Sequence, residues 1–359
     1  NKSDFTCHFS RVFLSLCPKP SVTDMKYVTI IDIAKALGIS KSTVSRALSG
    51  DTHNVNPDTM RMICETADRM GYQRNEMAVN LRKQSSRHIG IIIPEVVTSF
   101  FMNFIQQAQR ELRQRGYRTL IAVSNEDAAL EAENLHMFEQ CRVEGVLMSV
   151  CHKSKNVAIY NKVMAHGIPI VFFDRAVDGI EASQVRIDDY LMAFFMVETL
   201  IRSGCKKIVH LAGPDFISNG YDRHRGYRDA LEKFKIPYDE HYVVAGGLDA
   251  EQGAEAMEKF LSKGLELDAV FGFTETATLG AKSVLQKLHY RIPKDVSLCC
   301  ISGTKLCTLV HPTITAVEQP VLQMATISCR LLLDQIANPS CPKESAILRG
   351  EMTMRESTL

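Results

Sequence analysis

The residues between 29 and 48 place hydrogen-bond donors at helical spacing. A lysine, an arginine and short hydroxyl side chains share the outer face of one expected helix: Lys41, Ser42, Thr43, Ser45 and Arg46. In the major groove of DNA, an arginine can donate two hydrogen bonds to guanine, and hydroxyl groups can reach bases or phosphates. The residue types and their spacing therefore predict a face that reads DNA.

Two short helices must position this face. Apolar residues recur at i, i+3, i+4 and i+7 in the first of them, at Ile30, Ile33, Ala34 and Leu37. Gly38 ends that helix, and Ser40 caps the second, whose inner residues are Val44, Ala47 and Leu48. Two helices joined by a tight turn with glycine form a helix-turn-helix. A solvated helix hairpin is the alternative, but the turn and the donor face together favour DNA binding.

A third helix is expected after a polar loop. Asn56 is its cap, Pro57 opens it and Gly71 closes it. This helix completes the small core of an all-α module, which we place at residues 25–74. Residues 1–24 do not fit the pattern, and we expect them to be a disordered leader upstream of a natural start at Met25.

Composition limits the class of protein. At 359 residues and 45% hydrophobic content, the chain is long enough for two or three globular domains. Its net charge is only +1, yet basic residues exceed acidic ones between 25 and 90. No apolar run reaches the length of a membrane span. The eleven cysteines are irregularly spaced, so we expect reduced, buried thiols of a cytoplasmic protein and no metal site.

From residue 88 onward, strand and helix patterns alternate. The first set of apolar strands is expected at 88–94, 118–123, 145–150 and 169–174, and the second at 207–212, 242–245, 269–273 and 296–301. Such alternation predicts parallel sheets covered by helices, and two similar sets predict two Rossmann-like lobes. Ligands of these sheets bind outside the carboxyl ends of the strands, so a cleft between the lobes is the expected site.

At this level of detail the chain resembles the LacI family of bacterial transcriptional repressors, whose core is similar to periplasmic binding proteins. The segments that carry the resemblance are 29–34 (TIIDIA), 42–48 (STVSRAL), Gly71-Tyr72, 89–94 (IGIIIP), Phe100-Phe101, Asp174-Arg175, Arg223 with Gly226-Tyr227, 293–297 (PKDVS) and Gln319-Pro320. The resemblance covers nearly all of the chain from Lys26 to Leu359. It implies a two-lobed domain over 88–359 that binds an effector and dimerises.

The resemblance also assigns the DNA contacts. It implies a homodimer, or a pair of dimers, on a near-palindromic double-stranded operator, contacted by Thr29, Lys41, Ser42, Thr43, Ser45, Arg46, Asn54, Tyr72, Asn75 and Leu81. Residues 75–87 would be a hinge helix and linker, with Leu81 wedged into the minor groove at the operator centre. The alternative for Leu81 is that it only packs the linker between domains.

The effector site implied by the resemblance combines aromatic and polar residues: Phe100, Phe101, Asp174, Asn219, Arg223, Leu248 and Glu275. Some positions depart from the family pattern. Thr274-Glu275 replaces the usual Asn-Asp pair, and Leu248 stands where an aromatic residue is common. These departures leave a sugar, a sugar phosphate or acid, and a less common ligand all open.

The sequence therefore predicts a ligand-responsive transcriptional regulator, acting as a repressor and carrying no catalytic residues or cofactor. A solute-binding protein of a transport system is the alternative, but it would lack the helix-turn-helix. An enzyme on a doubly wound fold would need a catalytic motif. We interpret Asp188-Asp189 as structural rather than as a metal pair, and His210 as a core residue.

Overall fold

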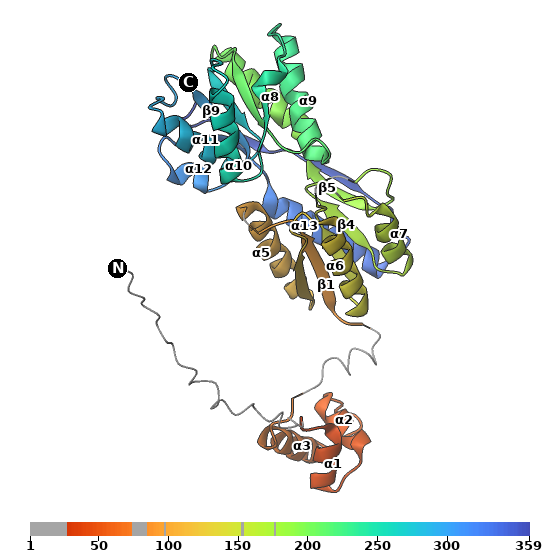
Figure 1. Cartoon of the computed structure of the whole chain (residues 1–359). Coiled ribbons are helices and arrows are strands. Elements are labelled where there is room, and N and C mark those ends of the chain that lie inside the picture. The colour runs from red at the N-terminus through yellow and green to blue at the C-terminus, as the bar shows by residue number, and fades with distance from the viewer. Residues whose placement is uncertain (1–26, 74–84, 97, 152–153, 176) are drawn as a thin grey trace, which may run out of the picture. The chain divides into compact units, whose positions relative to one another are not determined.

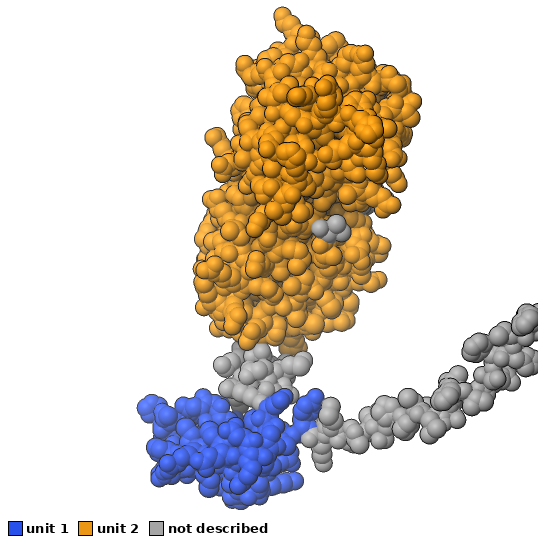
Figure 2. Space-filling model, turned by 90° about the vertical axis from the view of Figure 1, so that its left-hand side faces the viewer, with its two compact units in different colours: residues 1–82 blue, residues 83–359 orange. Residues whose placement is uncertain are grey.

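The computed structural model describes residues 27–73, 85–96, 98–151, 154–175 and 177–359. The chain divides into two compact units, Asn1–Arg82 and Lys83–Leu359 (Figure 2). The predicted leader at 1–24, most of the predicted hinge, and the candidate DNA contacts Asn75 and Leu81 lie outside the described residues.

The first unit contains the three predicted helices, α1 (Ile30–Leu37), α2 (Lys41–Leu48) and α3 (Pro57–Arg69). Thr29 and Asp32 form a reciprocal capping box at the start of α1, and Ser40 and Asn56 cap α2 and α3. Gly38 adopts φ 65° at the end of α1, a conformation that favours glycine. A small core holds the helices together, formed by Ile33, Ala34, Val44, Ala47, Val55, Ile63 and Ala67.

The second unit contains two six-stranded sheets, one in each lobe (Figure 1). The first sheet is parallel, with the order β11 (Ser345–Leu348), β5 (Ser183–Ile187), β4 (Ile170–Phe173), β3 (Gly145–Met148), β1 (His88–Ile93) and β2 (Arg118–Val123). Its helices are α5 (Ser99–Gln114), α6 (Ala128–Gln140), α7 (Val157–Ala165) and α13 (Val321–Ala337).

The second sheet repeats this arrangement. Its order is β12 (Glu351–Thr353), β10 (Thr315–Glu318), β9 (Ser297–Gly303), β8 (Ala269–Gly272), β6 (Ile208–Ala212) and β7 (Val243–Ala245), with β12 alone antiparallel to its neighbour. Its helices are α8 (Asp189–Arg202), α9 (Ser218–Lys233), α10 (Ala250–Leu261), α11 (Glu275–Lys287) and the short α12 (Leu306–Leu309).

The chain passes between the lobes at three places. It leaves the first lobe between β5 and α8, returns between β10 and α13, and crosses again between β11 and β12. In Figure 1, α13 lies with the helices of the first lobe although it follows the second lobe in sequence. The two lobes are therefore joined by three separate connections.

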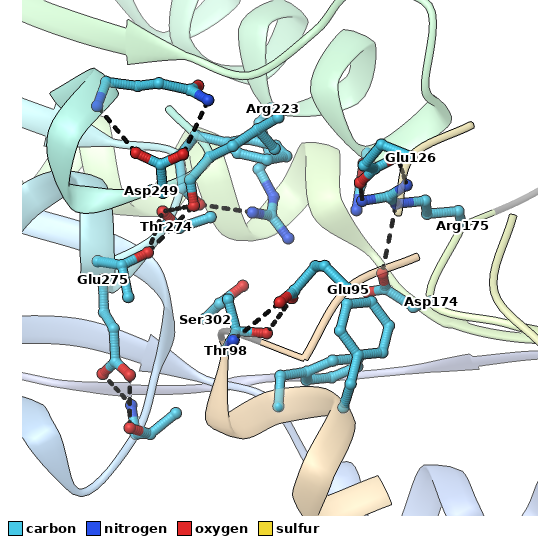
Figure 3. Close-up of a pocket in the computed structure, with 18 residues that line it drawn as sticks. Glu95, Thr98, Glu126, Asp174, Arg175, Arg223, Asp249, Thr274, Glu275 and Ser302 are labelled. Atoms are coloured by element: carbon cyan, nitrogen blue, oxygen red, sulfur yellow. Dashed lines mark hydrogen bonds and ion pairs between the residues drawn. The ribbon is translucent and has the colours of Figure 1, made fainter. Parts of the chain in front are cut away.

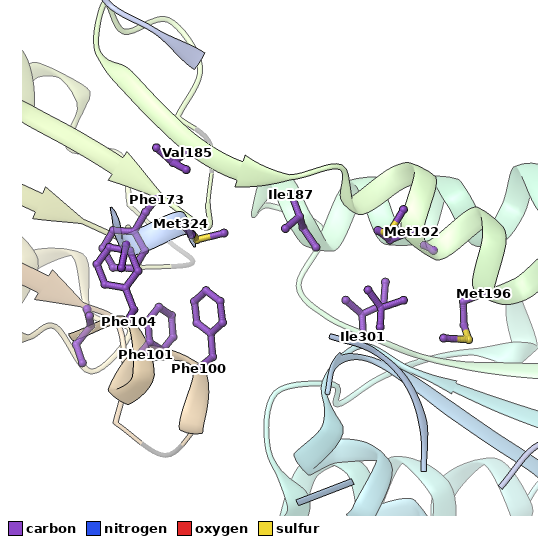
Figure 4. Packing of buried hydrophobic residues seen from close by; sticks show 14 of the residues in the cluster. Phe100, Phe101, Phe104, Phe173, Val185, Ile187, Met192, Met196, Ile301 and Met324 are labelled. Carbon is purple, nitrogen blue, oxygen red and sulfur yellow. The ribbon is translucent and has the colours of Figure 1, made fainter. Parts of the chain in front are cut away.

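One hydrophobic cluster extends through both lobes. It includes Phe101, Phe104 and Phe173 from the first lobe, and Met196 and Ile301 from the second. Figure 4 shows Val185 of β5 beside the first group and Ile187, at the end of this strand, further toward the second group. The outer faces of the two sheets are covered by separate clusters. The inner layers of the two lobes are thus continuous along β5.

The alternating strands and helices confirm the predicted fold class, while several short elements were not predicted. Among these are β5, α12, β11 and β12. The β5 segment reads SQVRI, and its alternate residues Ser183, Val185 and Ile187 are buried. Only Val185 and Ile187 of its five residues are apolar, so the segment is too short to show a clear alternation in the sequence. The prediction of buried thiols was wrong for Cys64 and Cys141, which are exposed, and right for Cys205, Cys299 and Cys300.

Candidate functional sites

The outer face of α2 is open to solvent. Lys41, Ser42 and Arg46 are exposed, and Thr43 and Ser45 are half-buried. The Thr43 hydroxyl lies 2.8 Å from the Ser40 hydroxyl, so part of its hydrogen-bonding capacity is used in capping the helix. The helix therefore presents its long donors outward while Val44 and Ala47 anchor it from behind.

The other candidate DNA contacts of the first unit lie at element ends. Thr29 donates its hydroxyl to Asp32 (2.7 Å) at the start of α1. The exposed Asn54 donates its amide to both carboxylate oxygens of Asp51 (3.1 and 2.9 Å), which lowers the Asp51 pKa. Tyr72 follows α3 and packs against the small core. Each of the three is held by local contacts of the module.

A cavity of about 270 Å³ lies between the two lobes of the second unit (Figure 3). It is lined by all seven residues predicted for the effector site: Phe100, Phe101, Asp174, Asn219, Arg223, Leu248 and Glu275. Their role as ligand contacts stays a prediction. The sequence did not single out Glu95, Thr98, Glu126, Arg175, Asp249 and Phe273 as site residues, although they also line this cavity.

Arg223 projects from α9 in the second lobe and is held on two sides. Its Nε donates to Asp189 Oδ1 (2.7 Å), and its Nη1 donates to the carbonyl oxygen of Phe273 (2.6 Å). The guanidinium also lies over the Phe273 ring, 4.3 Å from its centroid. Asp189, expected only to be structural, thus positions a residue that lines the cavity.

Arg175 lines the cavity from the first lobe, where it lies just after β4. Its guanidinium forms a two-pronged ion pair with Glu126 (3.0 and 2.8 Å) and donates to the carbonyl oxygen of Val150 (2.7 Å). Each lobe therefore supplies one arginine, and each arginine is bound to one carboxylate and one backbone carbonyl. Paired contacts of this kind fix the plane of a guanidinium group.

Asp174 has the most perturbed environment of the predicted residues. Its backbone adopts φ 65°, a strained conformation for a residue other than glycine. Among the described residues, its ionic partner is Nε of Arg175 at 3.9 Å, too long for a hydrogen bond. Burial raises the pKa of this carboxyl group to about 7, against the opposing effect of Arg175. The carboxylate is thus available to a ligand that donates hydrogen bonds.

Asn219 and Glu275 behave differently in the second lobe. Within the described part of the chain, the buried Oδ1 of Asn219 has no hydrogen-bond partner. The Glu275 carboxylate, by contrast, accepts bonds from the Thr304 backbone (2.7 Å), the Thr304 hydroxyl (2.5 Å) and Cys307 Sγ (3.2 Å). In Figure 3 its side chain extends away from Arg223. Asn219 is open to a ligand, whereas Glu275 secures the loop after β9.

Apolar groups complete the cavity. The rings of Phe100 and Phe101 meet edge to face, with centroids 5.0 Å apart, and both side chains are buried. Leu248 lies opposite on the second lobe, where the hydroxyls of Thr274 and Thr276 bind its carbonyl oxygen. The cavity therefore offers apolar faces beside a few polar groups, a composition typical of small-molecule sites.

Two further expectations concern residues outside the cavity. Asp188 accepts a hydrogen bond from the Leu191 backbone (2.9 Å) and caps α8, which agrees with its predicted structural role. His210 is fully buried against Phe271 and Tyr227, as expected of a core residue, and burial lowers its pKa to about 3.

In the part of the chain that the structure describes, no three His, Cys, Asp or Glu side chains are grouped to hold a metal. None of the described helices is both long and apolar enough to cross a membrane.

Comparison with known proteins identifies both units. Residues 29–75 match the family described as bacterial regulatory proteins, lacI family, and residues 86–339 match periplasmic binding proteins and sugar binding domain of LacI family. Catabolite control protein A of Priestia megaterium is 28% identical over 92% of this chain and 99% of its own length. The transcriptional repressor CytR of Escherichia coli is 27% identical over 92% and 96%.

The fold comparison gives the same result. The crystal structure of the lac repressor dimer, bound to operator and an anti-inducer, superposes with a TM-score of 0.80 at 21% identity, covering 93% of this chain and 100% of that one. At this identity the likeness shows the fold alone. The family matches extend over most of the chain, from the helix-turn-helix through both lobes of the core. This protein therefore belongs to the LacI family of bacterial regulatory proteins.

Proposed function

We propose that this protein is a ligand-responsive transcriptional repressor, switched by a small molecule bound between its lobes. The observation that carries the proposal is that one chain of this family combines an exposed donor face on α2 with a cavity between lobes that is lined by apolar faces and a few polar groups. The donor face supplies contacts to DNA, and the cavity supplies the differential binding that a switch requires. We place its action in the cytoplasm and assign no catalytic step to it.

The DNA-binding form is a dimer in which each α2 reads half of a near-palindromic operator. The base edges are contacted by Lys41, Ser42 and Arg46. The phosphates are contacted by Thr29, Thr43, Ser45, Asn54 and the Tyr72 region. Asn75 belongs to the hinge segment, and Leu81 enters the minor groove at the operator centre. A wedge of this kind partly unstacks a base step, and the bend brings more protein to the phosphates.

The ligand acts through the angle between the lobes. Residues Phe100, Phe101 and Asp174 contact it from the first lobe, and Asn219, Arg223 and Leu248 from the second. Glu275 supports the second group by holding the loop at Thr304. A ligand that favours the DNA-binding angle is a corepressor, and one that opposes it is an inducer. The family description of the matched core favours a sugar or a sugar derivative.

Operator binding tests the proposal directly. An operator is first selected from a random duplex pool with the full-length protein, and its affinity is measured by fluorescence anisotropy at low and moderate salt. We expect Arg46→Ala to weaken specific binding by roughly tenfold to a hundredfold, the usual loss for one base contact. Arg330→Ala removes one exposed positive charge from α13 of the core and is the matched control.

The hinge assignment has its own test. Leu81→Ala is expected to lower operator affinity while leaving affinity for the small molecule largely intact. The opposite pattern, with ligand binding lost and DNA affinity unchanged, would refute the placement of the wedge. If the wild-type protein selected no duplex at low salt, the alternative interpretation as a solute-binding protein of a transport system would have to be considered again.

A further inference from the structure

Both arginines of the cavity are already neutralised by the protein. Arg223 is paired with Asp189, and Arg175 with Glu126, at hydrogen-bonding distances of 2.7 to 3.0 Å. Each guanidinium also donates to a backbone carbonyl. A guanidinium that binds a phosphate or carboxylate of a ligand must offer its fork of donors to that anion. In this cavity two of the three nitrogen atoms of each guanidinium group already donate hydrogen bonds to the protein.

The remaining charges of the cavity are negative. Among the described lining residues, the carboxylates outnumber the guanidinium groups, because Asp174, Glu95, Asp249 and Glu275 add to Glu126. Glu95 is bound by Thr98, Asp249 by Gln252, and Glu275 by Thr304. A phosphate or carboxylate entering this cavity would meet like charges in a medium of low dielectric constant, which is strongly unfavourable.

Two of the groups left for a ligand are hydrogen-bond acceptors, and a third, the buried Nε of Arg175, is a donor without a hydrogen-bond partner among the described residues. The Asp174 carboxylate is 3.9 Å from its ionic partner, and the buried Oδ1 of Asn219 has no partner among the described residues. Both side chains are more than nine-tenths buried. An unmatched buried acceptor carries a desolvation cost until a donor reaches it. Ligand hydroxyl groups are such donors, whereas ionised phosphate and carboxylate groups accept hydrogen bonds and cannot satisfy these atoms.

The apolar lining and the size of the cavity narrow the ligand further. Phe100, Phe101 and Phe273 present carbon surfaces on both lobes. The volume of about 270 Å³ falls below the roughly 300–1,000 Å³ typical of sites for drug-sized molecules. The ligand is therefore small, with apolar C–H or ring faces beside its hydroxyl groups.

From these observations we infer that the cavity selects an uncharged polyhydroxylated molecule, such as a free sugar or a nucleoside, and rejects its phosphorylated and carboxylated counterparts. The inference names the ligand class of the switch proposed above, so its regulatory meaning rests on that proposed function. The selectivity itself is a property of the cavity and is measured without DNA.

The test uses the full-length protein and matched sets of neutral and charged compounds. Thermal-shift measurements, followed by calorimetry, compare ribose with ribose 5-phosphate, glucose with glucose 6-phosphate and glucuronate, and cytidine and adenosine with their 5′-monophosphates. At least one neutral member is expected to raise the melting temperature, because a ligand that binds the folded state stabilises it. Its charged counterpart is expected to bind at least a hundredfold more weakly.

Variants connect the selectivity to the named atoms. Asp174→Asn is expected to weaken the neutral ligand by at least tenfold, because the amide offers one acceptor in place of a carboxylate. Asp334→Asn, which removes an exposed carboxylate from α13, is the control and leaves affinity unchanged. Equal losses in the two variants would contradict a specific role for Asp174.

Two results would overturn the inference. One is a phosphorylated or carboxylated member that binds as tightly as its neutral partner, and the other is the absence of any shift with the neutral members. Operator affinity without ligand is measured in parallel on the same preparation. Loss of ligand selectivity with operator binding intact would reject this inference alone, whereas selective ligand binding without operator binding would reject the proposed repressor.

Discussion

The two walls of the cavity hold an arginine in the same way but at different depths. In the second lobe, the side chains of Arg223 and Asp189 are 1% and 3% exposed. In the first lobe, Arg175 and Glu126 are 5% and 17% exposed. The deeper pair is surrounded by protein and belongs to the core of its lobe. The shallower pair is partly exposed to solvent, so we expect replacement of its carboxylate by mutation to lower the free energy of unfolding by less.

The walls also differ in the acceptor that each leaves open. The first lobe offers the ionisable Asp174, whereas the second offers the neutral amide oxygen of Asn219. The contact at Asp174 therefore depends on pH, and the contact at Asn219 does not. A ligand bound by both lobes therefore makes one contact that changes with pH and one that does not.

The largest effect is expected from removing the buried carboxylate of the second wall. Asp189→Ala leaves the guanidinium of Arg223 buried without its counter-ion, which costs about 3–5 kcal/mol of unfolding free energy. Glu126→Ala is expected to cost less, because Glu126 is itself 17% exposed and its removal opens a path for water to Arg175. Urea unfolding followed by circular dichroism measures both. Equal losses would contradict the difference in depth between the walls.

The next effect concerns Asp174 and pH. Its pKa of about 7 in the folded chain lies above the ordinary value of 3.8, so the folded state holds the proton more tightly than the unfolded state. This contribution to stability is complete below pH 4 and is lost as the pH rises through 7. Asp174→Asn is therefore expected to be more stable than wild type at pH 8, by up to about 4 kcal/mol, and similar to it at pH 4.

Ligand binding should show the opposite dependence on pH. Hydroxyl donors favour the charged carboxylate, so affinity for a neutral ligand is expected to rise as the pH passes through 7. The charged groups that act on Asp174 are Arg175, Asp189, Arg223 and Glu95. Calorimetry between pH 6 and 8 measures the effect. A flat profile in wild type, or the same slope in Asp174→Asn, would assign the titration to another group.

A smaller effect on stability, with a gain of function, is expected from Glu126→Gln. The amide keeps the shape of the side chain but frees the charge of Arg175, at a cost of about 1–2 kcal/mol. The first wall then becomes attractive to anions, and the phosphorylated counterpart of the neutral ligand should gain at least tenfold in affinity. Asp334→Asn serves again as the control for the loss of one negative charge. An equal gain in affinity for the phosphorylated compound in that variant would show that only the net charge of the protein matters.

The smallest effect is expected at the loop held by Glu275. Cys307→Ala removes one of the donors to its carboxylate and leaves those of Thr304 in place, so stability should fall by about 1 kcal/mol. Cys307→Ser keeps a donor and should restore most of that loss. Thermal unfolding compares the pair. A larger loss of ligand affinity than of stability would indicate that Glu275 grips the ligand directly.

How much the sequence predicted depends on the distance along the chain between cooperating residues. In the first unit, Thr29 with Asp32 and Ser40 with Thr43 are three residues apart, so caps and faces follow from local spacing. The cavity lies between lobes, and its seven predicted residues were found through family resemblance. Glu126 reaches Arg175 across 49 positions, and no periodicity marks such a partner.

The role of Asp189 was missed for a related reason. The residue stands next to Asp188 at the start of α8, where two adjacent acids suggest capping or a metal. Its partner Arg223 lies 34 positions away on α9, and the pairing depends on how closely these helices pack. At Gly226 a side-chain carbon would lie 2.4 Å from the Tyr190 carbonyl oxygen, so only glycine permits this approach. Tertiary packing, rather than local pattern, therefore decides the function of Asp189.

The three connections between the lobes constrain how the protein can move. Two bodies joined at one point can twist and swing freely, but three separate crossings restrict twisting and favour a change in the angle between the lobes. That angle is then the main mechanical coordinate of the core. A donor and an acceptor fluorophore placed on α6 and α10 would report the angle between the lobes by energy transfer in single molecules. Each effective ligand would then be characterised by the value of that angle which it favours.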